Sequence, residues 1–358
     1  MAPIKSSLAR SVSKLLGVYK DTDLSLRGSS TSSRFIAPPP VAASGGYIDG
    51  QPGGNGYTYH VFTGPGNFTV TQGGTIEILL VGGGGPSGST QSSTTVGNCG
   101  GGGAGGIVHA TAYPIESGTH PITVGDPAPQ PLTPSPGRGV DSTFVDAGGP
   151  TTITALGGGG GSYYGVGGSP QPGGAGFPGG SGGGGGYPGQ PGGTANQPSQ
   201  NPGISGLLQY GNPGGQMSTP EGASNYDYGG GGGAGQAGFD GDGPATPSPN
   251  TSGHGGDGQP FSDFPGSLPA FGPLPSAWKT AVAPQGYFGG GGGGGVWNGA
   301  GNPNMPGGLG GGGNGGTTPQ NGIENTGGGA GGSPSPPGSS QPTGKKGGSG
   351  ICIIRYSE

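Results

Sequence analysis

Histidines, carboxylates and cysteines are the residues of this sequence whose types could do chemistry. His60, His109, His120 and His254 are scattered along the chain, and no carboxylate stands at a fixed supporting distance from them. General acid–base catalysis needs such a group within hydrogen-bonding reach of a partner that orients it. We therefore expect no catalytic residues and a protein that is not an enzyme.

Two short segments carry spaced carboxylates that could coordinate Ca²⁺, "FDGDG" at 239–243 and "HGGDG" at 254–258. Neither has the downstream glutamate and the full ligand set of an EF-hand loop. Asp and Gly at this spacing are equally typical of tight turns, which is the interpretation we prefer. The glycine runs contain no G-x-x-x-x-G-K-S/T loop for phosphate, so we expect neither a metal nor a cofactor.

Cysteine content and charge exclude further classes. Cys99 and Cys352 are too few for a disulfide framework or a zinc site, and two small buried thiols are the favoured interpretation. The net charge is −5 and the basic residues cluster only near the N-terminus, so nucleic acid is not an expected partner. No stretch of 18 apolar residues predicts a membrane span, and the first 20 residues do not resemble an export signal.

Aromatic residues set among short polar residues are the best candidates for recognition. Aromatic faces stack on a partner while Asp and Asn donate or accept hydrogen bonds, a mixture typical of contacts with carbohydrate and protein. An equal alternative is that these residues only cap the glycine-rich region. The candidates lie in "SNYDYG", "PFSDFPGSLPAFGPLPSAWKT" and "GVWNG", and they are Tyr226, Tyr228, Phe271, Trp278 and Trp297.

The elements that must position these residues fall into five parts, of which the first is residues 1–36. Apolar residues recur there at spacings of three and four, which predicts a short amphipathic helix. The helix could bind anionic lipid or dock onto a protein, and the serine-rich polar face favours docking. The apolar stripe expected to make this contact is Ile4, Leu8, Val12, Leu15, Leu16 and Tyr19.

Residues 37–56 have the composition of a linker, with prolines at the start and glycines at the end. From 57 to 156, short runs of β-branched and aromatic residues alternate with Gly, Pro and Asn. We expect about seven strands there, forming an antiparallel β-sandwich or barrel. The predicted fold class is therefore mainly β.

Residues 157–350 are dominated by glycine runs, in a chain of 358 residues that holds 101 glycines and 40 prolines. Composition alone favours a flexible spacer, because glycine loses much conformational freedom on ordering and buries no side chain. The end of the chain argues otherwise. Residues 351–358 include "ICIIRY", an apolar strand that would be an aggregation hazard if left unpaired, so we expect it to return to the β module near Thr75–Val81.

A glycine region closed at both ends could be ordered as a bundle of polyglycine II helices. This polyproline-II-like helix has three residues per turn and no internal hydrogen bonds, so its amides and carbonyls must bond to neighbouring helices. Backbones approach closely enough for that only where side chains are absent. The run Gly289–Gly295 would form about two turns, and aromatic residues beside the runs would cap them.

Four stretches together resemble a known family. These are "YTYHVFTGPGNFTVTQGGTIEILLVGGGG", "GGGGAGGIVHATAYPI", "HPITVGD" and the closing "GGSGICIIRYSE", in which Cys352 stands where the family usually has Val. They resemble the glycine-rich domain of bacteriophage tail fibre and virion structural proteins, over about residues 57–358. The N-terminal "MAPIKSSLARSVSKLLGVYKDTDLSLRG" is similar to a leader on structural proteins of marine cyanobacterial phages.

The resemblance implies a non-enzymatic virion protein, a tail fibre or tail-associated component on the exterior of a particle assembled in the host cytoplasm. It implies partners as well: other virion proteins through the N-terminal helix, copies of itself in a homo-oligomer with a trimer favoured, and a host cell-surface glycan or outer-membrane protein. The aromatic candidates would then be host-surface contacts. Alternatives are a head decoration or a purely architectural fibre; a secreted matrix protein would need an export signal.

Overall fold

A computed structural model gives the fold, and it describes residues 40–88, 99–127, 137–149, 151–163, 174–186, 189–201, 203–217, 227–241, 253–296, 304–334 and 344–358. The chain divides after Pro39, and all described residues belong to the unit Pro40–Glu358. The helix expected in residues 1–36 lies outside the described residues.

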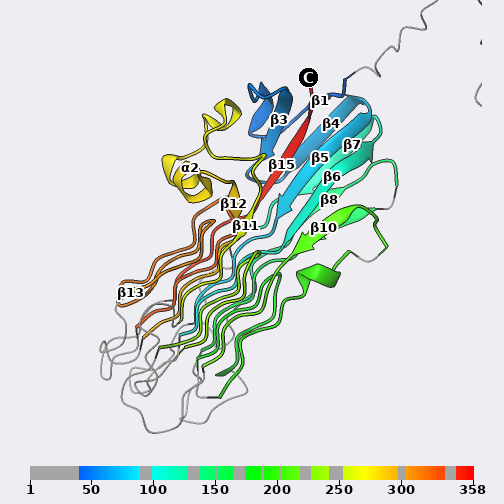
Figure 1. The fold of residues 1–358 in the computed structure, drawn as a ribbon. Coiled ribbons are helices and arrows are strands. Elements are labelled where there is room, and N and C mark those ends of the chain that lie inside the picture. Colours follow the sequence, from blue (N-terminus) through cyan, green and yellow to red (C-terminus); the bar gives the residue numbers. More distant parts are fainter. Residues whose placement is uncertain are drawn as a thin grey trace, which may run out of the picture. The chain divides into compact units, whose positions relative to one another are not determined.

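Two open antiparallel sheets form the β part of the molecule, which confirms the mainly β fold class (Figure 1). The six-stranded sheet has the order β10 (Leu207–Tyr210), β6 (Ile107–Ile115), β5 (Gly74–Val81), β15 (Ile351–Ser357), β3 (Tyr57–Phe62) and β2 (Ile48–Pro52). The five-stranded sheet has the order β1 (Ala42–Ser44), β4 (Gly66–Gln72), β7 (Gly118–Thr123), β8 (Ser142–Val145) and β9 (Thr152–Ala155).

The last strand of the chain lies inside the larger sheet. On one side β15 pairs with β5, with Ile351 opposite Val81, and on the other it pairs with β3, with Cys352 opposite Phe62. This return is the one expected for the apolar C-terminal segment. Its two neighbours remove the aggregation hazard, because neither edge of β15 stays unpaired.

The larger sheet is buried on both faces, which explains why "ICIIRY" is apolar at successive positions. Side chains alternate between faces along a strand. On β15, Cys352 and Ile354 join the core that lies between the two sheets, while Ile351 and Ile353 join a second core on the opposite face. A strand buried on both faces reads as a continuous apolar run.

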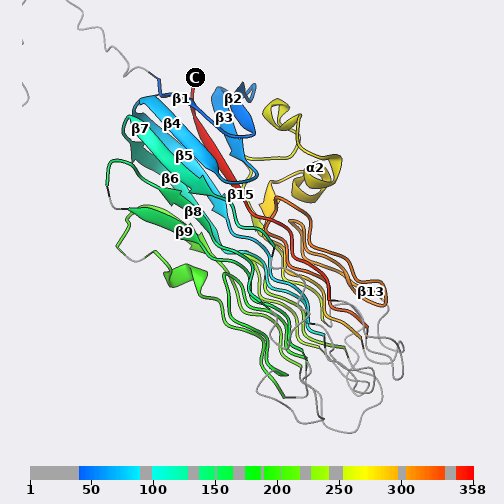
Figure 2. The same cartoon turned by 180° about the vertical axis from the view of Figure 1, so that it is seen from behind.

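A segment from within the expected glycine region covers that second face (Figure 2). It contains β11 (Gln259–Pro260), the 3₁₀ helix η3 (Pro269–Phe271), α2 (Ser276–Val282) and β12 (Tyr287–Phe288). Its buried Phe264, Phe271 and Trp278 pack in the same core as Ile351 and Ile353. The expectation of one continuous glycine region over 157–350 therefore needs correction, and β10 corrects it again by joining the larger sheet.

The expected linker at 37–56 also needs correction, because it holds β1 and β2. β1 pairs with β4 and β2 pairs with β3, and Ile48 is buried in the second core. Gly and Pro dominate the composition there, so the sequence pattern does not reveal the few residues that pair with β4 and β3. The remaining short elements are the 3₁₀ helix η2 (Gln197–Ser199) and the pair β13 (Asn304–Met305) and β14 (Gly315–Gly316).

Candidate functional site

Glycine-rich segments leave the end of the larger sheet and run side by side, and they form what we term the bundle (Figure 1). Its central run is Gly100–Gly106, which continues directly into β6. The amides of Gly103 and Gly106 both donate to one neighbouring segment, at the carbonyls of Gly159 and Leu156, over 2.8 Å. Donors three residues apart thus face the same neighbour.

Four other amides of the central run repeat this period on two further segments. They pair as follows: Gly102 with Ala330 (2.8 Å), Gly105 with Gly327 (2.8 Å), Gly101 with Gly229 (3.1 Å) and Ala104 with Gly232 (2.9 Å). Successive residues therefore point to three different neighbours and return to the first after three. The donors of this run therefore repeat with a period of three residues.

Carbonyls of the central run accept from three more segments. In the first of these segments, Gly82 donates to Gly106 at 3.0 Å and Gly85 donates to Gly103 at 2.8 Å. The other donors are Ser181 to Ala104 (2.9 Å), Gly184 to Gly101 (2.8 Å) and Gly292 to Gly102 (2.9 Å). The central run is thus bonded to six segments in all, and its buried polar groups are paired, as buried backbone requires.

The longest run, Gly289–Gly295, shows what seven consecutive glycines do in this fold. Every one of its amides donates to a carbonyl of another segment: Gly289 to Thr326, Gly290 to Gly310, Gly291 to Gly256, Gly292 to Gly102, Gly293 to Gly313, Gly294 to Gly253 and Gly295 to Cys99, over 2.7–3.1 Å. The run is therefore an ordered part of the bundle and not a free tether.

At Gly102 and Gly292, crowding rather than backbone conformation demands glycine. A Cβ on Gly102 would collide with the carbonyl oxygen of Gly85, and one on Gly292 would collide with that of Ala330. Neither glycine has a positive φ, so any residue could adopt the backbone conformation. Only the absence of a side chain lets the neighbouring backbones approach to hydrogen-bonding distance.

Polar side chains also bond to backbone groups of the bundle. Asn212 donates through Nδ2 to the carbonyls of Gly233 and Ala234 (3.1 and 2.9 Å). Asp240 Oδ1 accepts the amide of Gln216 at 2.9 Å. Asp257 Oδ1 likewise accepts the amide of Leu309 at 2.8 Å. These side chains thus satisfy backbone donors and acceptors of the bundle.

The end of the bundle away from the sheets gathers residues from distant parts of the sequence. Tyr228 donates its amide to Gly295 (2.9 Å), Gly295 donates to Cys99 (2.9 Å), and Ser87 donates to Lys345 (3.0 Å). Each of these segments borders a gap in the described ranges. Several runs of the bundle therefore end together here, which makes this end the candidate functional site.

A sequence model described as a glycine-rich domain matches residues 60–357. The chain belongs to the glycine-rich domain family. No curated protein matched the chain at the level of sequence.

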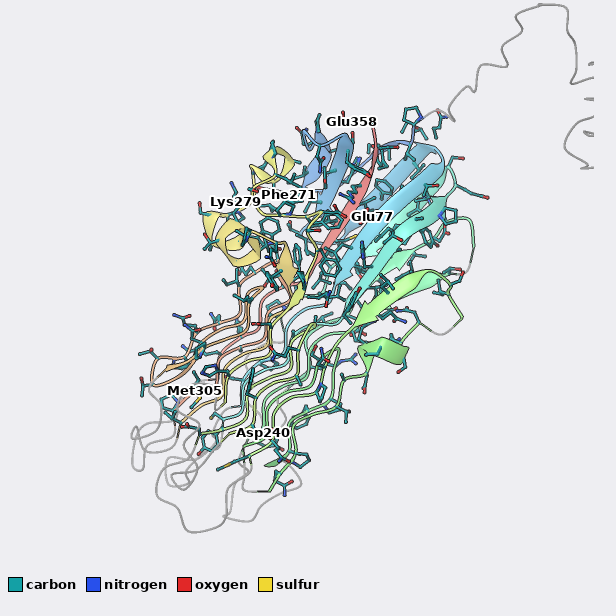
Figure 3. All side chains as sticks on the ribbon, in the orientation of Figure 1. Glu77, Asp240, Phe271, Lys279, Met305 and Glu358 are labelled. Atoms are coloured by element: carbon teal, nitrogen blue, oxygen red, sulfur yellow. The ribbon has the colours of Figure 1, made fainter. Side chains whose placement is uncertain are left out.

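Glu77 on β5, labelled in Figure 3, belongs to an ion network that reaches the last strand, β15. Arg355 contacts Glu77 through Nε and Nη2, both 2.7 Å from Oε2, and it contacts Asp263 Oδ2 at 3.0 Å. Glu77 Oε1 lies 2.7 Å from His109 Nε2. Burial alone would raise the pKa of Glu77, but the hydrogen bonds from His109 and Arg355 outweigh it and hold that pKa below its ordinary value.

The structure places three of the five recognition candidates in the interior of the glycine-rich domain. Tyr228, Phe271 and Trp278 are 1%, 0% and 1% exposed. Phe271 packs edge-on against Trp278, whose Nε1 donates to Asn325 O at 2.7 Å. This burial does not fit a surface contact for these three residues, and it makes Phe271 and Trp278 part of the second core.

The remaining candidates lie outside the described residues. These are Tyr226 and Trp297 among the recognition candidates, and Ile4, Leu8, Val12, Leu15, Leu16 and Tyr19 among the docking residues. No contact or exposure is therefore assigned to them.

The side chains that could do chemistry are separated or already bonded in the described part of the domain. His60 lies 3.0 Å from the hydroxyl of Tyr356 through Nε2, and burial lowers its pKa. Cys99 and Cys352 are buried free thiols, and burial raises the pKa of Cys99 to about 12. Within the described ranges, no group of three or more His, Cys, Asp or Glu residues could hold a metal ion.

Among the residues that the structure describes, no helix is both long enough and apolar enough to cross a membrane.

Proposed function

We propose that the bundle is a set of packed polyglycine II helices. The observation that supports this is the three-residue donor period of Gly100–Gly106, with six bonded neighbours around it. A polyglycine II helix has three residues per turn and directs its amides and carbonyls outward, so it produces that pattern. An α-helix would bond within its own segment, and a β-strand would direct its bonds to two neighbours only.

We further propose that the chain is a non-enzymatic structural protein of a bacteriophage virion, a tail fibre or tail-associated component. The resemblance of the glycine-rich stretches and of the N-terminal leader supports this assignment. Residues 1–36 would dock the protein to other virion proteins through the apolar stripe, as one copy of a homo-oligomer, with a trimer favoured. The β-sheets and the bundle would then stand on the exterior of the particle.

The geometry of the bundle supports a role in presenting residues to a host surface. Several of its runs end side by side at the end away from the sheets, where they border gaps in the described ranges. An ordered backbone lattice fixes the ends of the described segments, and preorganisation of this kind lowers the entropic cost of binding. Host-surface recognition would fall to residues such as Tyr226 and Trp297 in these gaps, with a glycan or an outer-membrane protein as the target.

A head decoration or an architectural fibre without receptor binding is the alternative. In that alternative the docking segment and the bundle have the same roles, but no residue contacts the host surface. The two functions differ in whether binding to host cells depends on aromatic residues near the end of the bundle.

The test has two parts. Antibodies against the purified protein should label intact particles by immuno-electron microscopy, and absence of the protein from purified particles would refute the virion assignment. The purified chain should bind host envelopes, and W297A and Y226A should weaken that binding. L309A is the matched control, because Leu309 is an exposed apolar side chain in the bundle. Labelled particles without envelope binding would establish the architectural alternative.

A further inference from the structure

A pocket of about 310 Å³ opens between the two sheets, where β6, the turn between β8 and β9, and the segment leading into β10 meet. Six residues define its character: Tyr113, Asp146, Thr151, Ile204, Ser205 and Leu207. We propose that this inter-sheet pocket binds one pyranose ring of a neutral saccharide. The proposal does not depend on a virion role, because it rests on the β-sheets alone.

Hydrogen-bond acceptors gather on one side of the pocket. The hydroxyl of Tyr113 donates to Asp146 Oδ2 at 2.8 Å, which links the two sheets. Asp146 Oδ1 accepts the amide of Gly148 at 3.0 Å. The phenol oxygen and both carboxylate oxygens keep lone pairs for a ligand, so this side of the pocket favours a molecule that donates O–H groups.

The charge of Asp146 is not neutralised by the histidine beside it. His120 Nδ1 lies 3.4 Å from Asp146 Oδ1, but this nitrogen accepts the amide of Ala147 at 3.1 Å. Its Nε2 faces the carbonyl of Glu116 at 3.1 Å and therefore carries the hydrogen. The imidazole is thus the neutral Nε2–H tautomer, and the carboxylate keeps its charge at the pocket wall.

An apolar wall and two hydroxyl-bearing residues complete the surroundings. Ile204 and Leu207 line the pocket and pack on the core between the sheets, while Thr151 and Ser205 carry hydroxyls that donate and accept. A pyranose ring has the matching composition, because its C–H surface is apolar and its rim carries hydroxyls. Small-molecule sites commonly combine an apolar lining with a few placed polar groups.

Size and charge narrow the ligand class. The volume lies at the lower end of the ~300–1,000 Å³ typical of ligand sites, which suits one ring better than an oligosaccharide. Neither Lys nor Arg occurs among the described residues that line the pocket, and Asp146 is anionic. Uronic acids and sugar phosphates would be repelled and left without a cationic partner, so the pocket selects neutral sugars.

Saturation-transfer NMR on the full chain tests the proposal. The probes are the methyl glycosides of glucose, galactose, mannose and N-acetylglucosamine, with glucuronic acid as a charged ring of the same shape. At least one neutral glycoside should receive saturation and glucuronic acid should not. D146N and Y113F should each weaken the affinity for that glycoside about tenfold, since D146N replaces one acceptor oxygen by an N–H donor and Y113F removes the hydroxyl.

Two further variants keep the test decisive. E116Q removes a neighbouring carboxylate that does not line the pocket, and it should leave the affinity unchanged. A112W fills the rim from an exposed position on β6, and it should abolish transfer while leaving the thermal unfolding midpoint unchanged. Absence of transfer from the wild-type chain to all four neutral glycosides, or equal transfer in A112W, would overturn the proposal.

Discussion

The guanidinium of Arg355 donates to the carboxylate of Glu77 over 2.7 Å, although 278 residues separate them along the chain. Arg355 lies directly opposite Glu77 in the pairing of β15 with β5, so the ion pair follows from the strand register. The whole bundle lies between these two residues in sequence. The pair therefore closes the glycine-rich region at the sheet from which it begins.

Replacing Arg355 with methionine should lower the free energy of unfolding by about 3–5 kcal/mol, because Glu77 would remain as a buried charge without its main partner. Arg138→Met is the matched control, since its ion pair with Asp141 is exposed and should contribute only about 0–1 kcal/mol. Denaturant titration of both variants measures the difference. Equal effects of the two substitutions would show that the buried pair does not stabilise the fold.

The lowered pKa of Glu77 predicts how stability depends on pH. Because the folded pKa lies below the unfolded value of about 4.3, the carboxylate stabilises the fold fully above that pH. This stabilisation is lost as the pH falls through the folded pKa. Glu77→Gln should be less stable than the wild type at neutral pH, and the difference should shrink below about pH 4. A constant difference from neutral pH downward would contradict this linkage.

Gly102→Ala tests whether crowding demands glycine in the bundle. The added Cβ would collide with backbone that cannot move without breaking other hydrogen bonds, so a loss of about 1–3 kcal/mol or more is expected. Gly64→Ala is the control, because open space surrounds Gly64 and its φ is not positive, and its effect should stay within about 0.5 kcal/mol. A Gly102→Ala variant as stable as Gly64→Ala would mean that the central run is not tightly packed.

Deletion of Ile351–Glu358 should abolish cooperative unfolding and cause aggregation. It would remove the strand between β5 and β3 and leave two long unpaired edges facing each other. Deletion of Ser357 and Glu358 alone, both exposed, is the control and should have little effect. Thermal unfolding and size-exclusion chromatography measure both outcomes. If the chain without Ile351–Glu358 melts like the intact chain, β15 does not hold the glycine-rich region closed against the sheet.

Local patterns could predict the strands and the return of the last one. β-branched residues bounded by Gly and Pro mark β3 to β9, and an apolar hexamer such as Ile351–Tyr356 has no stable place except in a sheet. The same reasoning fails for β1 and β2. Ala42–Ser44 and Ile48–Pro52 are too short and too rich in small residues to stand out, and they become strands only because β4 and β3 offer edges.

The fate of the aromatic residues could not be predicted from their types. Trp278 and Phe271 stand in a segment rich in Pro, Ser and Gly, where no 3.6- or 2-residue period separates buried from exposed positions. Their burial depends on the outer face of the larger sheet, whose apolar side chains come from β2, β3, β5, β6 and β15. The sequence did carry one signal: β5 and β15 are apolar at successive positions, so both faces of the sheet must be packed against another part of the chain.

Hydrogen exchange across Gly289–Gly295 tests the central claim most directly, because all seven amides donate to other segments. The account predicts strong protection of the whole run, lost together with protection of the central run Gly100–Gly106 when the bundle opens. Gly56 and Gly64 in the sheet loops provide unprotected references within the same chain, since neither amide is among the described turn and loop hydrogen-bond donors. Exchange of Gly289–Gly295 at random-coil rates would contradict an ordered bundle and make the run a flexible tether.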